Sequence, residues 1–147
     1  IVCFLSCNCS WWERGRQTIK FGVLICYDIV FSEVARSYVK KGAEVLFIPS
    51  KITNRGIKPW HMYIQVRALE NRVPIAAANV CDHTMSHNGK SISVDFKYES
   101  RSDIAVPKLT IGSTHQQTLV VDLDLKLAKK IRKRRFMDFK SDMYDFL

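Results

Sequence analysis

Apolar and polar positions form blocks along the chain that predict strands and helices in turn. The run over residues 19–27 is apolar apart from Lys20 and rich in β-branched residues, which is typical of a buried strand. Ser32 is a candidate helix N-cap, Glu33 suits the first turn of a helix, and Gly42 suits its end. This part of the chain therefore predicts a strand, a short turn and a helix.

The same alternation continues over the next forty residues. "AEVLFIPS" (43–50) predicts a second buried strand, and the following "KITNRGIKPW" (51–60) is loop-like. Apolar residues at helical spacing predict an amphipathic helix from Trp60 to Asn71, and "VPIAAANV" (73–80) predicts a third strand. Strands that alternate with helices indicate an α/β architecture, with these three strands side by side.

The C-terminal part is less regular. "SISVDF" (91–96) and "TLVVDLDL" (118–125) predict two further strands, and the chain from Lys126 onward predicts a helix or a basic tail. No internal repeat or low-complexity segment interrupts this order.

Composition restricts the class of protein. A chain of 147 residues with 47% hydrophobic content has the size of one globular domain, and no apolar run approaches the roughly 20 residues that span a bilayer. We expect no membrane partner. The N-terminal "IVCFLSCNCS" begins with Ile1 and lacks the basic region of a signal peptide, so we expect a fragment.

The net charge of +9 raises the question of an anionic partner. Much of the charge lies in "KLAKKIRKRRFMDFK" (126–140), a pattern typical of a solvated helix face or tail. Nucleic-acid binding is the alternative, but no recognition motif accompanies the run, so we expect no nucleic-acid partner.

Cysteine usage indicates a reducing compartment. The count is five, which is odd, and three cysteines form a C-x3-C-x-C pattern in the first ten residues. Disulfide scaffolds use even counts, and this spacing matches no usual zinc or iron–sulfur motif. The histidines are scattered as well. We expect a cytoplasmic protein without a metal.

Four blocks together resemble one family. "GVLICYDIVFSEVAR", "KGAEVLFIPS", "RALENRVPIAAAN" and "NGKSISVD" follow one another in the order and approximate spacing of the nitrilase superfamily, the carbon–nitrogen hydrolases. The resemblance implies an α-β-β-α sandwich of which this chain holds the C-terminal half. It divides the chain into an atypical segment, 1–18, and a partial carbon–nitrogen hydrolase domain, 19–147.

The resemblance gives Cys26 the position of the nucleophile in a Glu-Lys-Cys catalytic set. Taken alone, a cysteine after "VLI" more often packs in a core, because free cysteines are among the most buried residue types. In the family, the thiolate attacks an amide or nitrile carbon and forms a thioester that water hydrolyses. The resemblance assigns an oxyanion-binding role to the backbone N–H of Tyr27.

The family's glutamate base and catalytic lysine lie upstream of the nucleophile and have no matching position in this chain. Without them a cysteine thiol is mostly protonated at neutral pH, so we expect the chain alone to be impaired. A non-catalytic remnant or assembly module is the alternative function. Glu70 matches a family position that is expected to brace the helix against the sheet, alongside Arg67 and Asn71.

Pocket residues are implied by the resemblance as well. They are Ser50, Lys51, Asn54 and Trp60, and the alternative for Trp60 is an anchor packed on the core. The implied substrate is a small amide, carbamoyl compound or nitrile, with no cofactor. The family associates in pairs through helices that include the one after the nucleophile, so we expect a homodimer or higher oligomer.

Overall fold

A computed structural model describes residues 10–14, 17–81, 87, 89–98, 105–115 and 117–137. Its elements are β1 (Ser10–Arg14), β2 (Gln17–Val23), the 3-10 helix η1 (Cys26–Val30), α1 (Ser32–Lys40), β3 (Val45–Ser50), the 3-10 helix η2 (Asn54–Gly56), α2 (Ile57–Asn71), β4 (Ile75–Asn79), β5 (Ile92–Tyr98), β6 (Ala105–Ile111) and α3 (Leu125–Met137).

The strands form one six-stranded sheet in the order of the sequence, β1 to β6. Its centre is parallel, because β3 pairs in parallel with both β2 and β4. The remaining pairs, β1 with β2, β4 with β5 and β5 with β6, are antiparallel. The helices α1 and α2 supply the crossovers between the parallel strands, as strand–helix–strand units require.

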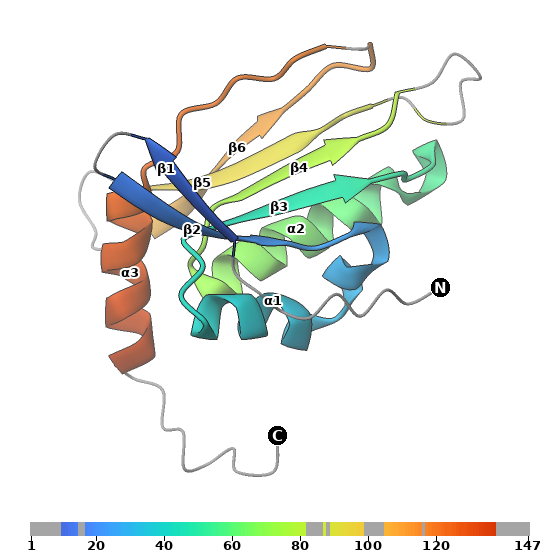
Figure 1. Cartoon of the computed structure of the whole chain (residues 1–147). Helices are drawn as coiled ribbons and strands as arrows, with labels where there is room; N and C mark the ends of the chain where they lie inside the picture. The colour runs from blue at the N-terminus through green and yellow to red at the C-terminus, as the bar shows by residue number, and fades with distance from the viewer. Residues whose placement is uncertain are drawn as a thin grey trace.

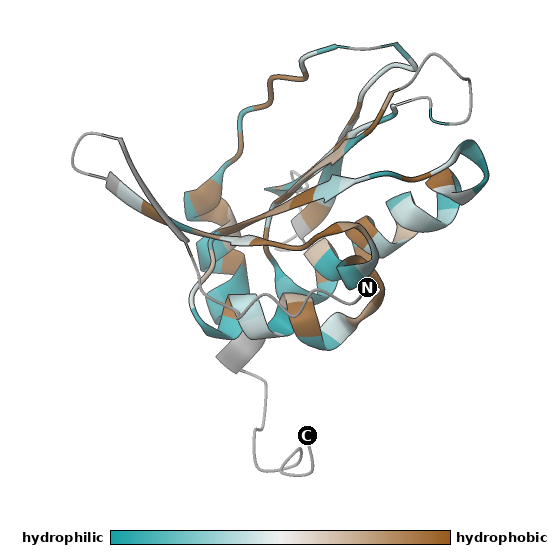
Figure 2. Cartoon of the chain, turned by 45° about the vertical axis from the view of Figure 1, so that its right-hand side comes forward, coloured by the Kyte–Doolittle hydropathy of each residue, from teal (hydrophilic) through white to brown (hydrophobic). Residues whose placement is uncertain are grey.

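The three α-helices lie together on one face of this sheet (Figure 1). The core lies between them and the strands, where Leu24, Leu46, Ile64 and Ile75 are fully buried. Close packing of α1 depends on Gly22 of β2, since a Cβ there would lie 2.6 Å from the ring of Tyr38. Figure 2 shows the helix layer beneath the sheet from a second side.

No helix of the described chain covers the opposite face of the sheet. Alternate residues of β3 point to it, so Phe47 is 40% exposed, whereas Leu46 and Ile48 on the helix side are buried. A hollow of about 1040 Å³ lies on this side, and Ser93 of β5 and the extended segment with Leu119 and Val121 line it. The described residues thus form one sheet and one helix layer, which is half of an α-β-β-α sandwich.

Helix α3 is attached by both apolar and polar contacts. Ala128 and Ile131 enter the core, and Arg132 Nη1 donates to the backbone oxygen of Ala43 at 2.9 Å. Burial lowers the pKa of Arg132 below its usual value, and the nearby charge of Glu44 opposes that shift. The basic run therefore forms a helix with one buried side. No helix in the described part of the chain is long and apolar enough to cross a membrane.

Most of the predicted elements are confirmed, with shifted boundaries. The three central strands are neighbours, as expected. The first ends at Val23 rather than residue 27, because the chain turns into η1. Helix α1 begins at Ser32 itself, with Phe31 as its N-cap and no side-chain capping bond, so the N-cap prediction is wrong. Helix α2 begins at Ile57, since Pro59 is compatible with a first helical turn.

Two strand predictions differ from the structure. No strand forms over "TLVVDLDL", whose described residues form an extended segment followed by α3. The strand β6 lies instead at Ala105–Ile111, where the sequence analysis predicted no element, and β1 forms at Ser10–Arg14 inside the segment considered atypical. The domain division at residues 18 and 19 stays a prediction.

Candidate functional site

Cys26 lies where the parallel centre of the sheet ends. The N–H of Leu24 still donates to the backbone oxygen of Phe47 at 2.9 Å, as in the ladder between β2 and β3. The chain then leaves the sheet, and Cys26 is the first residue of η1. This is the carboxyl edge of the parallel strands, where ligands bind in open α/β sheets.

The backbone of Cys26 is left-handed, with φ at 50°. Only a few per cent of residues other than glycine adopt positive φ, and those that do are often at functional sites. The cysteine thiol is partly buried and free. Sequence reasoning placed Cys26 at a strand end but gave no sign of this conformation.

Asp28 holds the turn around Cys26 closed. Its Oδ2 accepts a hydrogen bond from the N–H of Ile25 at 2.9 Å, and its own N–H donates to the oxygen of Ile25 at 3.0 Å. Both bonds join Asp28 to Ile25, so they close the turn that contains Cys26 and Tyr27. Asp28 is therefore a site residue that sequence analysis missed, and the signal for it was the acid two positions after the cysteine.

Tyr27 follows as the second residue of η1. The first N–H groups of a helix have no acceptor within it, so the N–H of Tyr27 belongs to the free amino end of η1. Its side chain is 67% exposed and packs edge-to-face on Phe31, with ring centroids 5.7 Å apart. The backbone is thus in a position that suits the predicted oxyanion role.

The predicted pocket residues divide into edge and core positions. Ser50 ends β3 and is buried, and its Oγ has no hydrogen-bond partner among the described residues. Lys51 and Asn54 follow at the same carboxyl edge and are exposed. Trp60 is only 3% exposed and belongs to the hydrophobic core, as its alternative role as an anchor requires. A substrate contact for Trp60 stays a prediction.

Asn79 fixes the loops at this edge, and the sequence analysis did not identify it. Its Oδ1 accepts from the N–H of Ile52 at 2.7 Å, and its Nδ2 donates to the oxygens of Ile52 at 3.0 Å and Gly89 at 2.8 Å. One side chain therefore joins the end of β4 to the loop that carries Lys51 and to the residues before β5. An asparagine at the end of a buried strand was the available signal.

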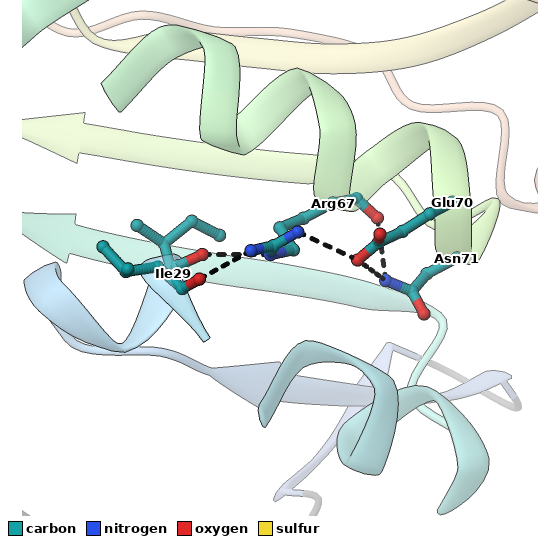
Figure 3. A network of polar contacts seen from close by, with 5 residues as sticks. Ile29, Arg67, Glu70 and Asn71 are labelled. Atoms are coloured by element: carbon teal, nitrogen blue, oxygen red, sulfur yellow. Dashed lines mark hydrogen bonds and ion pairs between the residues drawn. The ribbon is translucent and has the colours of Figure 1, made fainter. Parts of the chain in front are cut away.

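Arg67 connects α2 to η1 (Figure 3). Its guanidinium donates to the backbone oxygens of Ile29 and Val30 and forms an ion pair with Glu70 at 3.3 Å. The sequence analysis expected this group to brace the helix against the sheet. The guanidinium instead contacts η1, because the last backbone carbonyl oxygens of a helix have no N–H donor within that helix.

Two kinds of interaction are absent from the described part of the chain. In the part of the chain that the structure describes, no hydrogen bond or ion pair joins the thiol of Cys26 to a carboxylate or an ammonium group. The described residues also contain no group of three or more histidine, cysteine, aspartate or glutamate side chains arranged to hold a metal ion.

The hollow on the open face of the sheet is separate from the predicted site. Its lining includes Val23 and Asn79 but none of the predicted site residues Cys26, Ser50, Lys51 or Asn54. The predicted site therefore lies at the strand edge rather than in this hollow.

Comparison with known sequences agrees with the family resemblance of the four sequence blocks. The sequence model of the carbon-nitrogen hydrolase family matches residues 9–133. An omega-amidase, NIT2, of Xenopus tropicalis is 43% identical over 116 residues, which are 78% of this chain and 40% of that protein. A probable nitrilase of Schizosaccharomyces pombe is 32% identical over 128 residues, or 86% of this chain and 44% of that protein. The chain thus spans less than half the length of these curated relatives.

Solved structures show the same architecture. Nit3 of Saccharomyces cerevisiae, described as a member of branch 10 of the nitrilase superfamily, superposes with a TM-score of 0.60 at 23% identity. The match covers 91% of this chain and 47% of Nit3. This likeness establishes the fold, an α/β fold of the nitrilase type.

Proposed function

Because the chain belongs to the carbon–nitrogen hydrolase family, we propose that it acts in the hydrolysis of a non-peptide C–N bond, with Cys26 as the nucleophile. One observation carries the proposal. Cys26 combines the family's nucleophile position with a positive φ at the carboxyl edge of the parallel strands. A reactive side chain held rigidly on the end of a strand is what nucleophilic catalysis requires.

The proposed reaction proceeds through a thioester. The thiolate of Cys26 attacks the carbonyl carbon of an amide, a C–S bond forms, and the carbonyl π electrons move onto oxygen. Collapse of this intermediate breaks the C–N bond, and the departing nitrogen takes a proton and leaves as ammonia or an amine. Water then attacks the thioester, which releases the acid and restores the thiol.

Charge on the oxygen is stabilised at the amino end of η1. In this proposal the N–H of Tyr27 donates to the oxyanion, and removal of such a donor typically costs about a hundredfold in rate. The first turn of a helix also favours negative charge. Ser50, Lys51 and Asn54 would contact the substrate from the neighbouring strand end and loop, with Trp60 behind them.

The substrate class is a small amide, a carbamoyl compound or a nitrile. The names of the relatives, which include an omega-amidase and a 2-oxoglutaramate amidase of Bacillus subtilis, favour an amide. The odd count of five cysteines suits a reducing compartment, so we propose a cytoplasmic location.

A general base and a cation are still needed at the thiol, and the described residues supply neither to it. We therefore propose that a further polypeptide segment provides the family's glutamate and lysine. A non-catalytic remnant or assembly module is the second candidate, and the unassisted thiol is the observation that favours it.

Helix α2 supports the proposed association of two copies. Three of its outward residues, Met62, Tyr63 and Val66, are apolar and exposed, at 65%, 38% and 48%. An exposed group of this kind on a helix often marks a protein interface. We propose that α2 and α1 form a helix-to-helix contact with a second copy.

Ammonia release from a panel of small amides and nitriles tests the proposed function. The protein is assayed alone and together with a segment that carries the glutamate and lysine, such as the N-terminal half of the Xenopus omega-amidase. Release that requires Cys26 and persists in Cys81→Ala supports the enzyme. No release in either preparation favours the remnant.

A further inference from the structure

A buried arginine, Arg67, lies at the C-terminal end of η1. A short 3-10 helix leaves its last carbonyl oxygens without partners inside the helix. In η1 these are the oxygens of Ile29 and Val30, and Ile29 is only 1% exposed. Since buried carbonyls need donors, something outside η1 must supply them.

Arg67 of α2 supplies both donors. Its Nε lies 3.0 Å from the oxygen of Ile29, and its Nη2 lies 2.6 Å from the oxygen of Val30. The arginine is 8% exposed and reaches across 37 or 38 residues of sequence. Hydrogen bonds from a charged group are roughly twice as strong as neutral ones, and the rigid fork of a guanidinium fixes both acceptors at once.

The guanidinium is in turn held by its own helix (Figure 3). Its Nη1 contacts Glu70 Oε1 at 3.3 Å. Asn71 Nδ2 donates to the same Oε1 at 3.2 Å and to the backbone oxygen of Arg67 at 2.9 Å. The Glu70 carboxylate therefore compensates the buried charge, and Asn71 holds that carboxylate in place.

We propose that Arg67 is a positioning residue for the nucleophile, acting through η1. The inference rests on the proposed function of Cys26. Asp28 fixes the start of η1 and Arg67 fixes its end, so a helix of only five residues is held at both ends. A left-handed backbone at Cys26 persists only where the surroundings determine it, and these two anchors do so.

A purely structural role predicts a different result, and Arg132 provides the matched control. Arg132 is also an arginine that donates to a backbone oxygen, that of Ala43 at 2.9 Å, but it holds α3 rather than η1. Loss of either arginine destabilises the protein. Only loss of Arg67 is expected to change the behaviour of Cys26.

The test compares two thiols in one chain. Alkylation of Cys26 and Cys81 by iodoacetamide is followed by mass spectrometry of their peptides in wild type, Arg67→Ala, Arg67→Lys and Arg132→Ala. Since no charged partner holds the Cys26 thiol in the described chain, its rate reports access to the turn. Local opening of η1 in Arg67→Ala is expected to raise the Cys26-to-Cys81 rate ratio by about threefold to tenfold.

The other two variants distinguish a specific effect of Arg67 on Cys26 from a general loss of stability. Lysine restores the charge without the fork, so Arg67→Lys is expected to keep most of the increase, whereas Arg132→Ala leaves the ratio within about twofold of wild type. Global unfolding raises both rates together and does not change the ratio in this way. An unchanged ratio in Arg67→Ala, or an equal increase in Arg132→Ala, overturns the inference.

Glu70→Gln keeps the inference testable if Arg67→Ala does not fold. It preserves side-chain size while weakening the pair with the guanidinium, so a smaller increase in the same direction is expected, and no increase overturns the proposal. The proposed function is tested separately by ammonia release. A changed ratio without hydrolysis would leave Arg67 as the anchor of the Cys26 turn and remove only the catalytic role of that turn.

Discussion

Arg67 Nη2 lies 2.6 Å from the backbone oxygen of Val30, the last residue of the helical turn that Cys26 begins. The two residues come from different crossovers of the sheet, since η1 follows β2 and α2 follows β3. The packing of α2 therefore determines how the chain turns at the candidate nucleophile. A site that appears as one short motif in the sequence depends on a helix that begins some thirty residues later.

The positive φ of Cys26 predicts an uncommon response to glycine. Glycine adopts this conformation without strain, whereas alanine keeps the Cβ that makes it costly. We expect Cys26→Gly to be as stable as Cys26→Ala or more stable, by up to about 1 kcal/mol, in urea unfolding.

Ala35 is the matched control for that comparison, because it lies within helix α1 and is fully buried. There Ala35→Gly is expected to lose about 1 kcal/mol or more of unfolding free energy. If Cys26→Gly were less stable than Cys26→Ala by a similar amount, Cys26 would not have a left-handed backbone.

Asn79 predicts a pH-dependent defect when it is replaced by aspartate. The Nδ2 of Asn79 faces the oxygens of Ile52 and Gly89, so a carboxylate there would meet two carbonyl oxygens. That contact would raise the pKa of the introduced carboxyl in the folded protein. Its folded state then binds a proton more tightly than the unfolded state, so stability is lost as the pH rises from about 4 to 7.

Urea unfolding at the two pH values measures the effect. Asn79→Asp is expected to lose about 2 kcal/mol or more relative to wild type at pH 7, and less at pH 4. Asn79→Ala removes the same hydrogen bonds without adding a charge, so its loss should be similar at both values. A pH-independent loss in Asn79→Asp would mean that its side chain does not face the two carbonyls.

The exposed apolar face of α2 predicts self-association. Val66 and Met62 are 48% and 65% exposed, and a lysine at either position would place a charge in the proposed contact. Sedimentation of the wild-type chain should show a dimer or larger species, and Val66→Lys should shift it toward the monomer. Lys133→Glu on α3 is the control and should leave the mass unchanged. A wild-type chain that is a clean monomer would count against the contact.

The central strands could be predicted because their signal is local. Largely apolar runs that end in a turn predict β2, β3 and β4, and parallel pairing then brings the ends of these strands to one edge. The order of the four blocks indicated Cys26 as the candidate nucleophile, which stays a prediction. By contrast, Arg67 and Asn79 donate to backbone oxygens of separate segments, 10 to 38 residues away along the chain. No pattern of residue types predicts such contacts.

The prediction of the last strand was wrong, and β6 was missed, for a related reason. In "TLVVDLDL", alternation is real, since Leu119, Val121 and Leu123 line the hollow on the sheet, but one-sided burial does not require a strand ladder. The strand β6 contains Pro107, which reads as a loop signal and yet is acceptable in an edge strand. The pattern of apolar residues indicates directly which side chains are buried, but it indicates the hydrogen bonds of a strand only indirectly.

The most direct test of the account is to trap the thioester on Cys26. The chain, combined with the segment that supplies glutamate and lysine, is incubated with a small linear amide and quenched in acid, and its peptides are analysed by mass spectrometry. We predict an acyl group on the peptide containing Cys26, in wild type and in Cys81→Ala. Ammonia release without any acylated Cys26, or undiminished release from Cys26→Ala, would contradict the assignment of Cys26 as the nucleophile.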